Sequence, residues 1–222
     1  MFPEIISPQI LQLIGQATLD TLTMVAVAAG LGTALGLPLG VFLATSRRGE
    51  LFAAPAANLL LGTLVNAKRS TPFIILVVAI IPFTRLLAGT SIGTTAAIVP
   101  LTVAATPFIA RLIEGAIREV DQGLFEAARA MGATRMQILT RVLVPEAMPG
   151  IIAAITVSLV SLVGFSAMAG AIGGGGLGDL GIRFGYQRFM PEVMATVVVI
   201  LILFVQGLQS LGDWLVRRVS HR

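Results

Sequence analysis

Residues 151–172 read IIAAITVSLVSLVGFSAMAGAI, a run of 22 residues without a charged side chain. The hydrocarbon core of a bilayer is about 30 Å thick, and about 20 apolar residues cross it as an α-helix. Three further stretches share this character, at residues 22–43, 92–110 and 193–211. The four stretches predict an all-α integral membrane protein.

The composition agrees with that class. Of the 222 residues 56% are hydrophobic and only 12% are charged, whereas soluble domains are about 25% charged. The chain contains no cysteine, and its single histidine is His221. We therefore expect no metal site, no cofactor and no histidine-based catalysis. We expect one domain that covers residues 1–222.

The region between residues 51 and 88 is harder to interpret because Lys68 and Arg69 interrupt it. A charge at the centre of a spanning helix costs about 2.5–3.5 kcal/mol on insertion scales. We therefore predict an interfacial helix or half-helix over residues 53–65, followed by a span over residues 70–87. This interpretation brings the total to five transmembrane helices.

Basic residues predict the orientation of the chain. With the N-terminus outside, twelve of the 15 lysines and arginines lie inside, and only Arg85, Arg183 and Arg188 lie outside. Cytoplasmic loops carry such an excess of positive charge. Lys68, Arg69, the C-terminus and residues 113–148 are then cytoplasmic, and the glycine-rich segment 173–192 is external.

Small residues recur at every fourth position of the first span, namely Ala28, Gly32, Gly36, Gly40 and Ala44. Such a stripe lets another helix backbone approach closely. The partner helix belongs either to the same chain or to a second subunit, and the sequence leaves both alternatives open.

The polar segment before the fourth uncharged stretch has clear helix signals. Residues 124–131 read LFEAARAM, which are good helix formers, and Gly132 follows where a left-handed residue ends many helices. Thr134 and Gln137 have the spacing of a capping box, which predicts the start of a second short helix.

One face of the first short helix is apolar, because Leu124, Ala127, Ala128 and Met131 are spaced i, i+3, i+4 and i+7. A short amphipathic helix suits a groove on a partner protein. The alternative is a loop helix that lies on its own bundle, and the residues alone favour neither interpretation.

This segment resembles the EAA loop of ABC importer permeases, which follows E-A-A-x3-G-x9-I-x-L-P. The matching residues are Glu126, Ala127, Ala128, Gly132 and Pro145. Val142 and Val144 depart from the pattern, but both are apolar and keep its packing character. In that family the loop docks on a separate ATP-hydrolysing subunit. The resemblance implies an ATPase-coupling role, within residues 113–148, for Leu124, Glu126, Ala127, Ala128, Met131, Gly132 and Pro145.

The rest of the chain is most similar to the five-span permeases of methionine importers, through KRSTPFIIL at residues 68–76, PFIAR at 107–111 and GFSAMAG at 164–170. The resemblance implies a type I ABC importer permease-like bundle in the bacterial cytoplasmic (inner) membrane. It also implies alternating-access transport of methionine or a related amino acid. The implied partners are a second copy of the chain, two ABC ATPase subunits, an external substrate-binding protein and the lipid bilayer, with no nucleic acid.

Two other functions remain as alternatives. One is an ABC permease for a different small solute. The other is an ion-coupled secondary transporter, which predicts ionisable groups at mid-membrane and inverted repeats. Five spans do not divide into equal repeats, and the spans as assigned above lack ionisable groups at their centres. The chain contains no GxxxxGK[ST] sequence, so ATP hydrolysis is expected in the partner, and the chain itself is not expected to be an enzyme.

Two further patterns have competing interpretations. Ser158, Ser161, Phe165 and Met168 share a stripe of the fourth uncharged stretch and either line a translocation path or pack against other helices. Residues 173–181 contain GxGxxG, but a membrane-length helix precedes them instead of the strand that a dinucleotide site requires. We predict a flexible external loop there.

Overall fold

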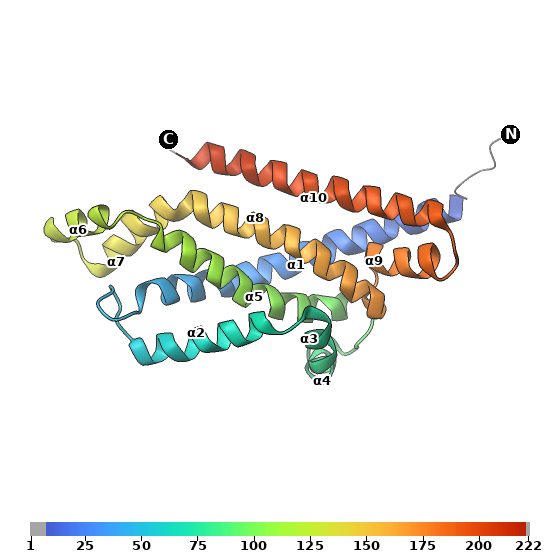
Figure 1. The fold of residues 1–222 in the computed structure, drawn as a ribbon, viewed down its shortest axis with the longest axis horizontal. Helices are drawn as coiled ribbons and strands as arrows, with labels where there is room; N and C mark the ends of the chain where they lie inside the picture. The colour runs from blue at the N-terminus through green and yellow to red at the C-terminus, as the bar shows by residue number, and fades with distance from the viewer. Residues whose placement is uncertain (1–7, 221–222) are drawn as a thin grey trace.

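The computed structural model describes residues 8–220, so His221 lies outside the described part of the chain. Within it all regular structure is helical. Four helices are long and apolar enough to cross a membrane, over Pro8–Thr45, Thr94–Arg118, Arg135–Gly174 and Pro191–Val219. They contain α1 (Pro8–Thr45), α5 (Thr94–Arg118), α8 (Val144–Ala169) and α10 (Pro191–Val219), which run side by side along the long axis (Figure 1). Four of the five expected spans are confirmed.

The core lies between α1, α5 and α8. Met24, Leu101, Ile109, Ile113 and Leu162 are each no more than 1% exposed and belong to one apolar cluster. Many apolar side chains on the outer faces of the helices are exposed, as expected for helices that face lipid or other subunits. The core therefore fixes α1, α5 and α8 relative to one another.

The small-residue stripe of α1 packs against α5. A Cβ atom built on Gly36 would lie 2.9 Å from the carbonyl oxygen of Thr106, and one on Gly40 would lie 2.6 Å from that of Ala110. A Cβ atom on Gly32 would lie 2.7 Å from Cβ of Ala105. These contacts decide between the two interpretations of the stripe, because its partner helix belongs to the same chain.

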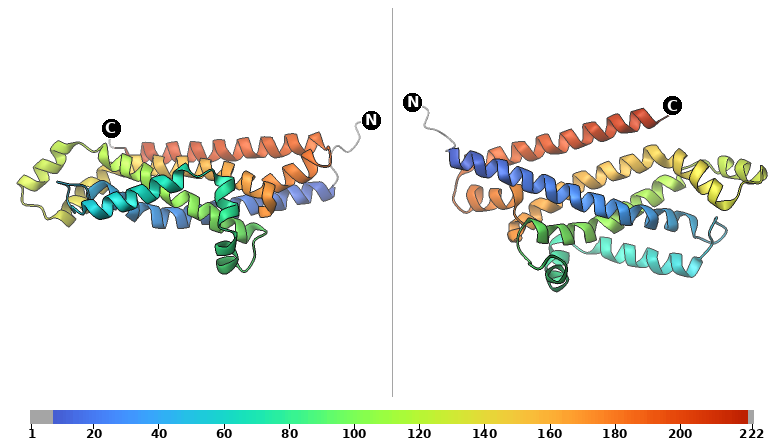
Figure 2. Two further views of the ribbon diagram at one scale, coloured as in Figure 1. Left: turned by 60° about the horizontal axis from the view of Figure 1, so that its bottom comes forward. Right: turned by 180° about the vertical axis from the view of Figure 1, so that it is seen from behind.

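The expected span over residues 70–87 is not one helix. Its residues fall in α3 (Phe73–Ala79) and α4 (Ile81–Ala88), after α2 (Pro55–Ser70). Pro72 lacks an N–H and disfavours helical geometry at the residue before it, and Thr71 is indeed extended, with φ −84° and ψ 124°. Helix α4 projects from the bundle (Figure 2). The prediction of a continuous helix here was wrong, because the prolines end the helices.

Lys68 and Arg69 lie beside α5. They occupy the last turn of α2, which ends beside the middle of α5 (Figure 1). The guanidinium carbon of Arg69 lies 5.8 Å from the ring centroid of Phe108, which is the fifteenth of the 25 residues of α5. Phe108 and the α5 residues beside Lys68, which are Val103, Thr106 and Pro107, belong to the half of the uncharged stretch 92–110 that is nearer to Arg111.

The glycine-rich segment is ordered helix, not a flexible loop. It consists of a π-helical turn (Gly170–Gly174), α9 (Gly176–Leu180) and a second π-helical turn (Gly181–Tyr186). The buried Leu177 donates its N–H to Oγ1 of Thr21, 2.8 Å away on α1. Helix α1 begins well before the predicted residue 22, and the additional turns give α9 a surface to pack on.

Candidate functional site

The segment that resembles the EAA loop forms two short helices at one end of the bundle. Helix α6 (Gln122–Ala130) begins after Asp121, whose Oδ1 accepts the N–H of Gly123 at 2.6 Å. Gly132 follows α6 with φ +79°. A left-handed conformation of this kind costs a residue with a Cβ atom about 1–2 kcal/mol. The predicted turn at Gly132 is therefore confirmed.

The second short helix has the predicted capping box. Helix α7 (Arg135–Ile138) begins after Thr134, which donates its N–H to Oε1 of Gln137 at 2.8 Å. In return, Gln137 donates its N–H to Oγ1 of Thr134 at 3.3 Å. A π-helical turn (Leu139–Leu143) continues into α8. Local hydrogen bonds thus fix the shape of this end of the molecule, which we call the α6–α7 end.

The apolar face predicted for α6 is divided between two environments. Ala128 is buried, together with Ile138 of α7 and Leu51 of the loop between α1 and α2. Ala128 does not lie on an outward docking face, because it is 4% exposed and packs against Leu51 and Ile138. The α1–α2 loop, which is distant in sequence, therefore completes the packing of this segment.

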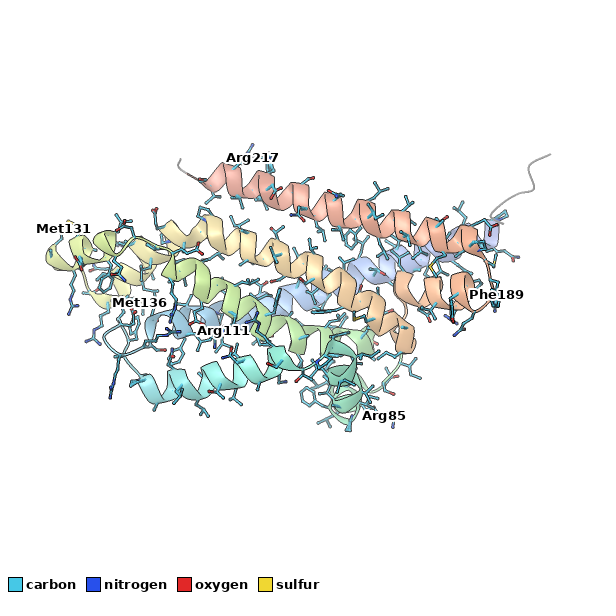
Figure 3. The ribbon with its side chains drawn as sticks, in the orientation of Figure 1. Arg85, Arg111, Met131, Met136, Phe189 and Arg217 are labelled. Atoms are coloured by element: carbon cyan, nitrogen blue, oxygen red, sulfur yellow. The ribbon has the colours of Figure 1, made fainter. Side chains whose placement is uncertain are left out.

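Other members of the predicted set face outward. Leu124 is 42% exposed and Met131 is 81% exposed, and Met136 adds a further apolar side chain that is 58% exposed. Met131 lies at the tip of the α6–α7 end (Figure 3). Ala127 and Glu126 are also exposed. Leu124, Ala127, Met131 and Met136 are thus apolar side chains that the described part of the chain leaves exposed, and the charged Glu126 lies beside Ala127.

Pro145 and Glu126, two further residues of the predicted coupling set, are both exposed. Pro145 is the second residue of α8, directly after the π-helical turn Leu139–Leu143. A proline lacks the N–H group that a regular α-helix would use at this point. Glu126 is the fifth residue of α6, one turn beyond the positive end of the helix dipole, whose effect falls off within the first turn.

The loop that carries Leu51 is fastened to the end of α1. Phe52 donates its N–H to the carbonyl oxygen of Thr45 at 2.9 Å, and Ala54 does the same to Ser46 at 2.9 Å. Asn58 of α2 donates from Nδ2 to the carbonyl oxygen of Leu43 at 2.9 Å. Because of these bonds, Leu51 connects the α6–α7 end to both α1 and α2.

A buried glutamate at the same end was not identified from the sequence. Glu114 of α5 is 4% exposed and forms ion pairs with three arginines. Its Oε1 lies 3.3 Å from Nη2 of Arg47 and 3.1 Å from Nη2 of Arg118, and its Oε2 contacts Nη1 of Arg111. The i−3 and i+4 spacing of Arg111 and Arg118 was a usable signal, whereas Arg47 lies 67 positions away.

Arg111 also attaches α2 to α5. Its Nε donates to Oδ1 of Asn66 at 3.1 Å, and its Nη2 donates to the carbonyl oxygen of Gly62 at 3.0 Å. With Nη1 on Glu114, all three nitrogens of the guanidinium group have a partner. Arg111 therefore has a structural role, and the Glu114 cluster joins α5, α2 and the α1–α2 loop.

The four residues of the predicted translocation stripe on α8 are not equivalent. Ser158 is 1% exposed and donates its hydroxyl to the carbonyl oxygen of Ala154 at 2.7 Å, so it is closed off within this chain. Ser161 donates in the same way to Val157 at 2.9 Å. Phe165 stacks on Phe73 of α3 with ring centroids 4.8 Å apart. Met168 is 49% exposed.

This chain matches a known protein family and several named proteins. Residues 36–222 match the family described as "Binding-protein-dependent transport system inner membrane component". The chain is 57% identical over 206 residues to a Vibrio cholerae serotype O1 protein named "Probable D-methionine transport system permease protein MetI", covering 93% of this chain and 92% of the relative. The Escherichia coli K12 protein named "D-methionine transport system permease protein MetI" is 54% identical over 151 residues, covering 68% and 70% of the two chains.

Solved structures show the same fold. A chain in the structure titled "Inward facing conformations of the MetNI methionine ABC transporter: CY5 native crystal form" superposes with a TM-score of 0.95 at 49% identity, covering 97% of this chain and 100% of that chain. A chain of "an amino acid ABC transporter with histidines" superposes with a TM-score of 0.79 at 21% identity, covering 94% of each chain. The second likeness concerns the fold alone.

Proposed function

We propose a function for this chain from one premise: it belongs to the family of binding-protein-dependent transport system inner membrane components. The chain is a multi-pass permease subunit of an ABC importer in the inner membrane. Its solute is methionine or a closely related amino acid. The carrying observation is the near full-length similarity to the Vibrio cholerae relative, whose name specifies D-methionine.

The permease works with separate partners. Two copies of the chain form the transport path, each copy binds one ATPase subunit at its α6–α7 end, and an external binding protein delivers the solute. The exposed apolar side chains of Leu124, Met131 and Met136 support this docking site, because the described part of the chain leaves them uncovered. ATP hydrolysis belongs to the partner subunit.

Transport follows from rigid-body motion of the docked segment. When ATP closes the two ATPase subunits, the α6–α7 ends move with them and the spans rock between inward-open and outward-open states. Phe165 and Met168 of α8 line the path and Ser161 lies at its edge. We do not keep Ser158 in the path, because it is buried within the chain.

The docking site is tested by Met131→Asp. The side chain of Met131 is 81% exposed, so the substitution leaves the fold of this chain intact. In the assembly it places an unpaired charge in an apolar contact, which is costly. A loss of about 3 kcal/mol corresponds to a roughly hundredfold weaker ATPase association. The measurement is co-purification of the ATPase subunit, together with methionine uptake into vesicles that contain the whole assembly.

The matched control is Arg217→Asp on the exposed end of α10 (Figure 3). It also introduces a carboxylate but lies outside the proposed contact, so association and uptake should stay near wild type. Wild-type association and uptake in the Met131→Asp variant would show that α6 is not the coupling element. A wild-type assembly that transports another solute but not methionine would contradict only the solute assignment.

The orientation of the chain is tested by introduced cysteines, since the native chain has none. The basic residues place the α6–α7 end and the C-terminus inside, and the α9 end outside. A cysteine at the exposed Gln187 should react with a membrane-impermeant thiol reagent in whole cells, whereas one at Arg217 should react only after the membrane is opened. Labelling of Arg217→Cys in intact cells would reverse the orientation.

A further inference from the structure

Two cations at the break between α2 and α3 have no carboxylate partner. The ion pairs within residues 8–220 involve Glu114 and Asp179, and neither acid pairs with Lys68 or Arg69. The exposed Arg69 faces the Phe108 ring, and Lys68 is exposed at the edge of a cavity. Both side chains are thus available to an external anion.

Lys68 and Arg69 lie beside the uncharged part of α5. Arg69 faces Phe108, and Lys68 shares a cavity with Val103 and Thr106, all within the uncharged stretch 92–110 of α5. A charged side chain beside such a stretch of a membrane bundle is costly unless it faces a water-filled path or a counter-ion.

The cavity beside Lys68 matches the chemistry of an apolar amino acid. Its volume is about 280 Å³, and its lining is apolar except for Lys68 and Thr106, with further contributions from Leu39, Leu61, Leu64, Val65, Val103 and Pro107. An amino acid with an apolar side chain carries a carboxylate at one end and apolar atoms at the other. One ammonium group at the edge of an apolar cavity is complementary to that distribution.

The same break also touches the proposed path. Phe73, the first residue of α3, stacks on Phe165 of α8. Only Ser70, Thr71 and Pro72 separate Phe73 from Arg69 in the chain. The cations therefore lie at the junction between α2 and α3, and Phe73 of α3 contacts the path residue Phe165.

We propose that Lys68 and Arg69 bind the carboxylate of the transported amino acid beside α5. Lys68 is the direct contact, and the cavity next to it holds the apolar side chain. This assignment rests on the proposed function, since it specifies where an importer of methionine holds its solute. Arg69 keeps the site positive while Phe108 holds its guanidinium group.

The experiment measures protection of a cysteine next to the site. Thr71→Cys is made in the assembly with the ATPase subunit, without delivery protein, and its alkylation from water is followed on this chain while methionine is titrated. Methionine should slow the alkylation, and methioninol, which lacks the carboxylate, should not. Lys68→Gln should raise the half-protecting methionine concentration about tenfold, as expected when a charge-assisted hydrogen bond is lost.

The conservative variant separates recognition from structure. Lys68→Arg keeps the charge and should restore protection, whereas a merely structural lysine would show the same loss with both substitutions. A cysteine at Arg217 should be alkylated at one rate with and without methionine. ATPase activity stimulated by the loaded delivery protein checks that each variant assembles.

Three results would overturn the assignment. The first is protection by methioninol equal to that by methionine, and the second is an unchanged half-protecting concentration in Lys68→Gln. The third is a failure of both Thr71→Cys and Ser70→Cys to react from water, since the site must be open to solute. Uptake of methionine by the wild-type assembly is measured in parallel, so that a failure of the proposed function is recognised separately.

Discussion

Gly40→Leu is expected to prevent the bundle from folding. Even a Cβ atom at this position would lie 2.6 Å from the carbonyl oxygen of Ala110 and 2.9 Å from Cβ of Ile113. These are a backbone atom and a fully buried side chain, and neither can move without separating α1 from α5. The cost is at least the upper end of the range for overpacking, about 3 kcal/mol. The measurement is the yield of monodisperse protein after purification in detergent.

A second glycine of α1 provides the control. Gly30 is exposed, and a Cβ atom built on it meets no atom within 4 Å, so Gly30→Leu should give a yield close to wild type. Both variants add the same side chain to the same helix and differ only in the face that carries it. Equal yields would show that α1 does not pack on α5 through its small residues.

Glu114→Ala is expected to destabilise the α6–α7 end. It would leave Arg47, Arg111 and Arg118 close together without the carboxylate that pairs with all three. Removing one partner of a buried ion pair costs about 3–5 kcal/mol. The lower figure applies here, because the side chain of Arg47 is 51% exposed and that of Arg118 is 33% exposed. A loss of about 3 kcal/mol lowers the unfolding midpoint by roughly 6 °C or more.

The thermal unfolding midpoint of the purified chain checks this expectation. Glu119→Ala is the matched control, since it removes an exposed carboxylate from the residue that ends α5, and the midpoint should then change little. If the Glu114→Ala and Glu119→Ala variants unfold at the same temperature, the Glu114 cluster contributes nothing to stability, and the attachment of α2 rests on packing alone.

The features that the sequence predicted correctly depend on short-range rules. Hydrophobic runs of membrane length located α1, α5, α8 and α10, because the thickness of the bilayer sets the length of a span. The left-handed residue Gly132 and the capping box of Thr134 and Gln137 each depend on residues within one or two turns. For the same reason, the apolar surface of α6 was identified, including Met131.

The features that the sequence did not predict depend on contacts between distant segments. The sequence left open whether Ala128 faces a partner or its own bundle, and its burial depends on Leu51, which lies 77 positions earlier in the chain. The contacts of Lys68 and Arg69 with α5 depend on how α2 packs along α5, which no local pattern specifies. The order in the glycine-rich segment depends on Thr21, whose hydroxyl accepts the N–H of Leu177 from 156 positions away.

The position of Leu51 has a consequence for how such permeases diverge. The proposed docking surface for an ATPase subunit depends on two separate segments of the sequence, because Ala128 and Ile138 pack on Leu51 of the α1–α2 loop. Substitutions at Leu51 and at Ala128 or Ile138 are therefore constrained to change in step. A chimaera that exchanges the coupling segment between two permeases inherits a matched interior only when the loop is exchanged with it.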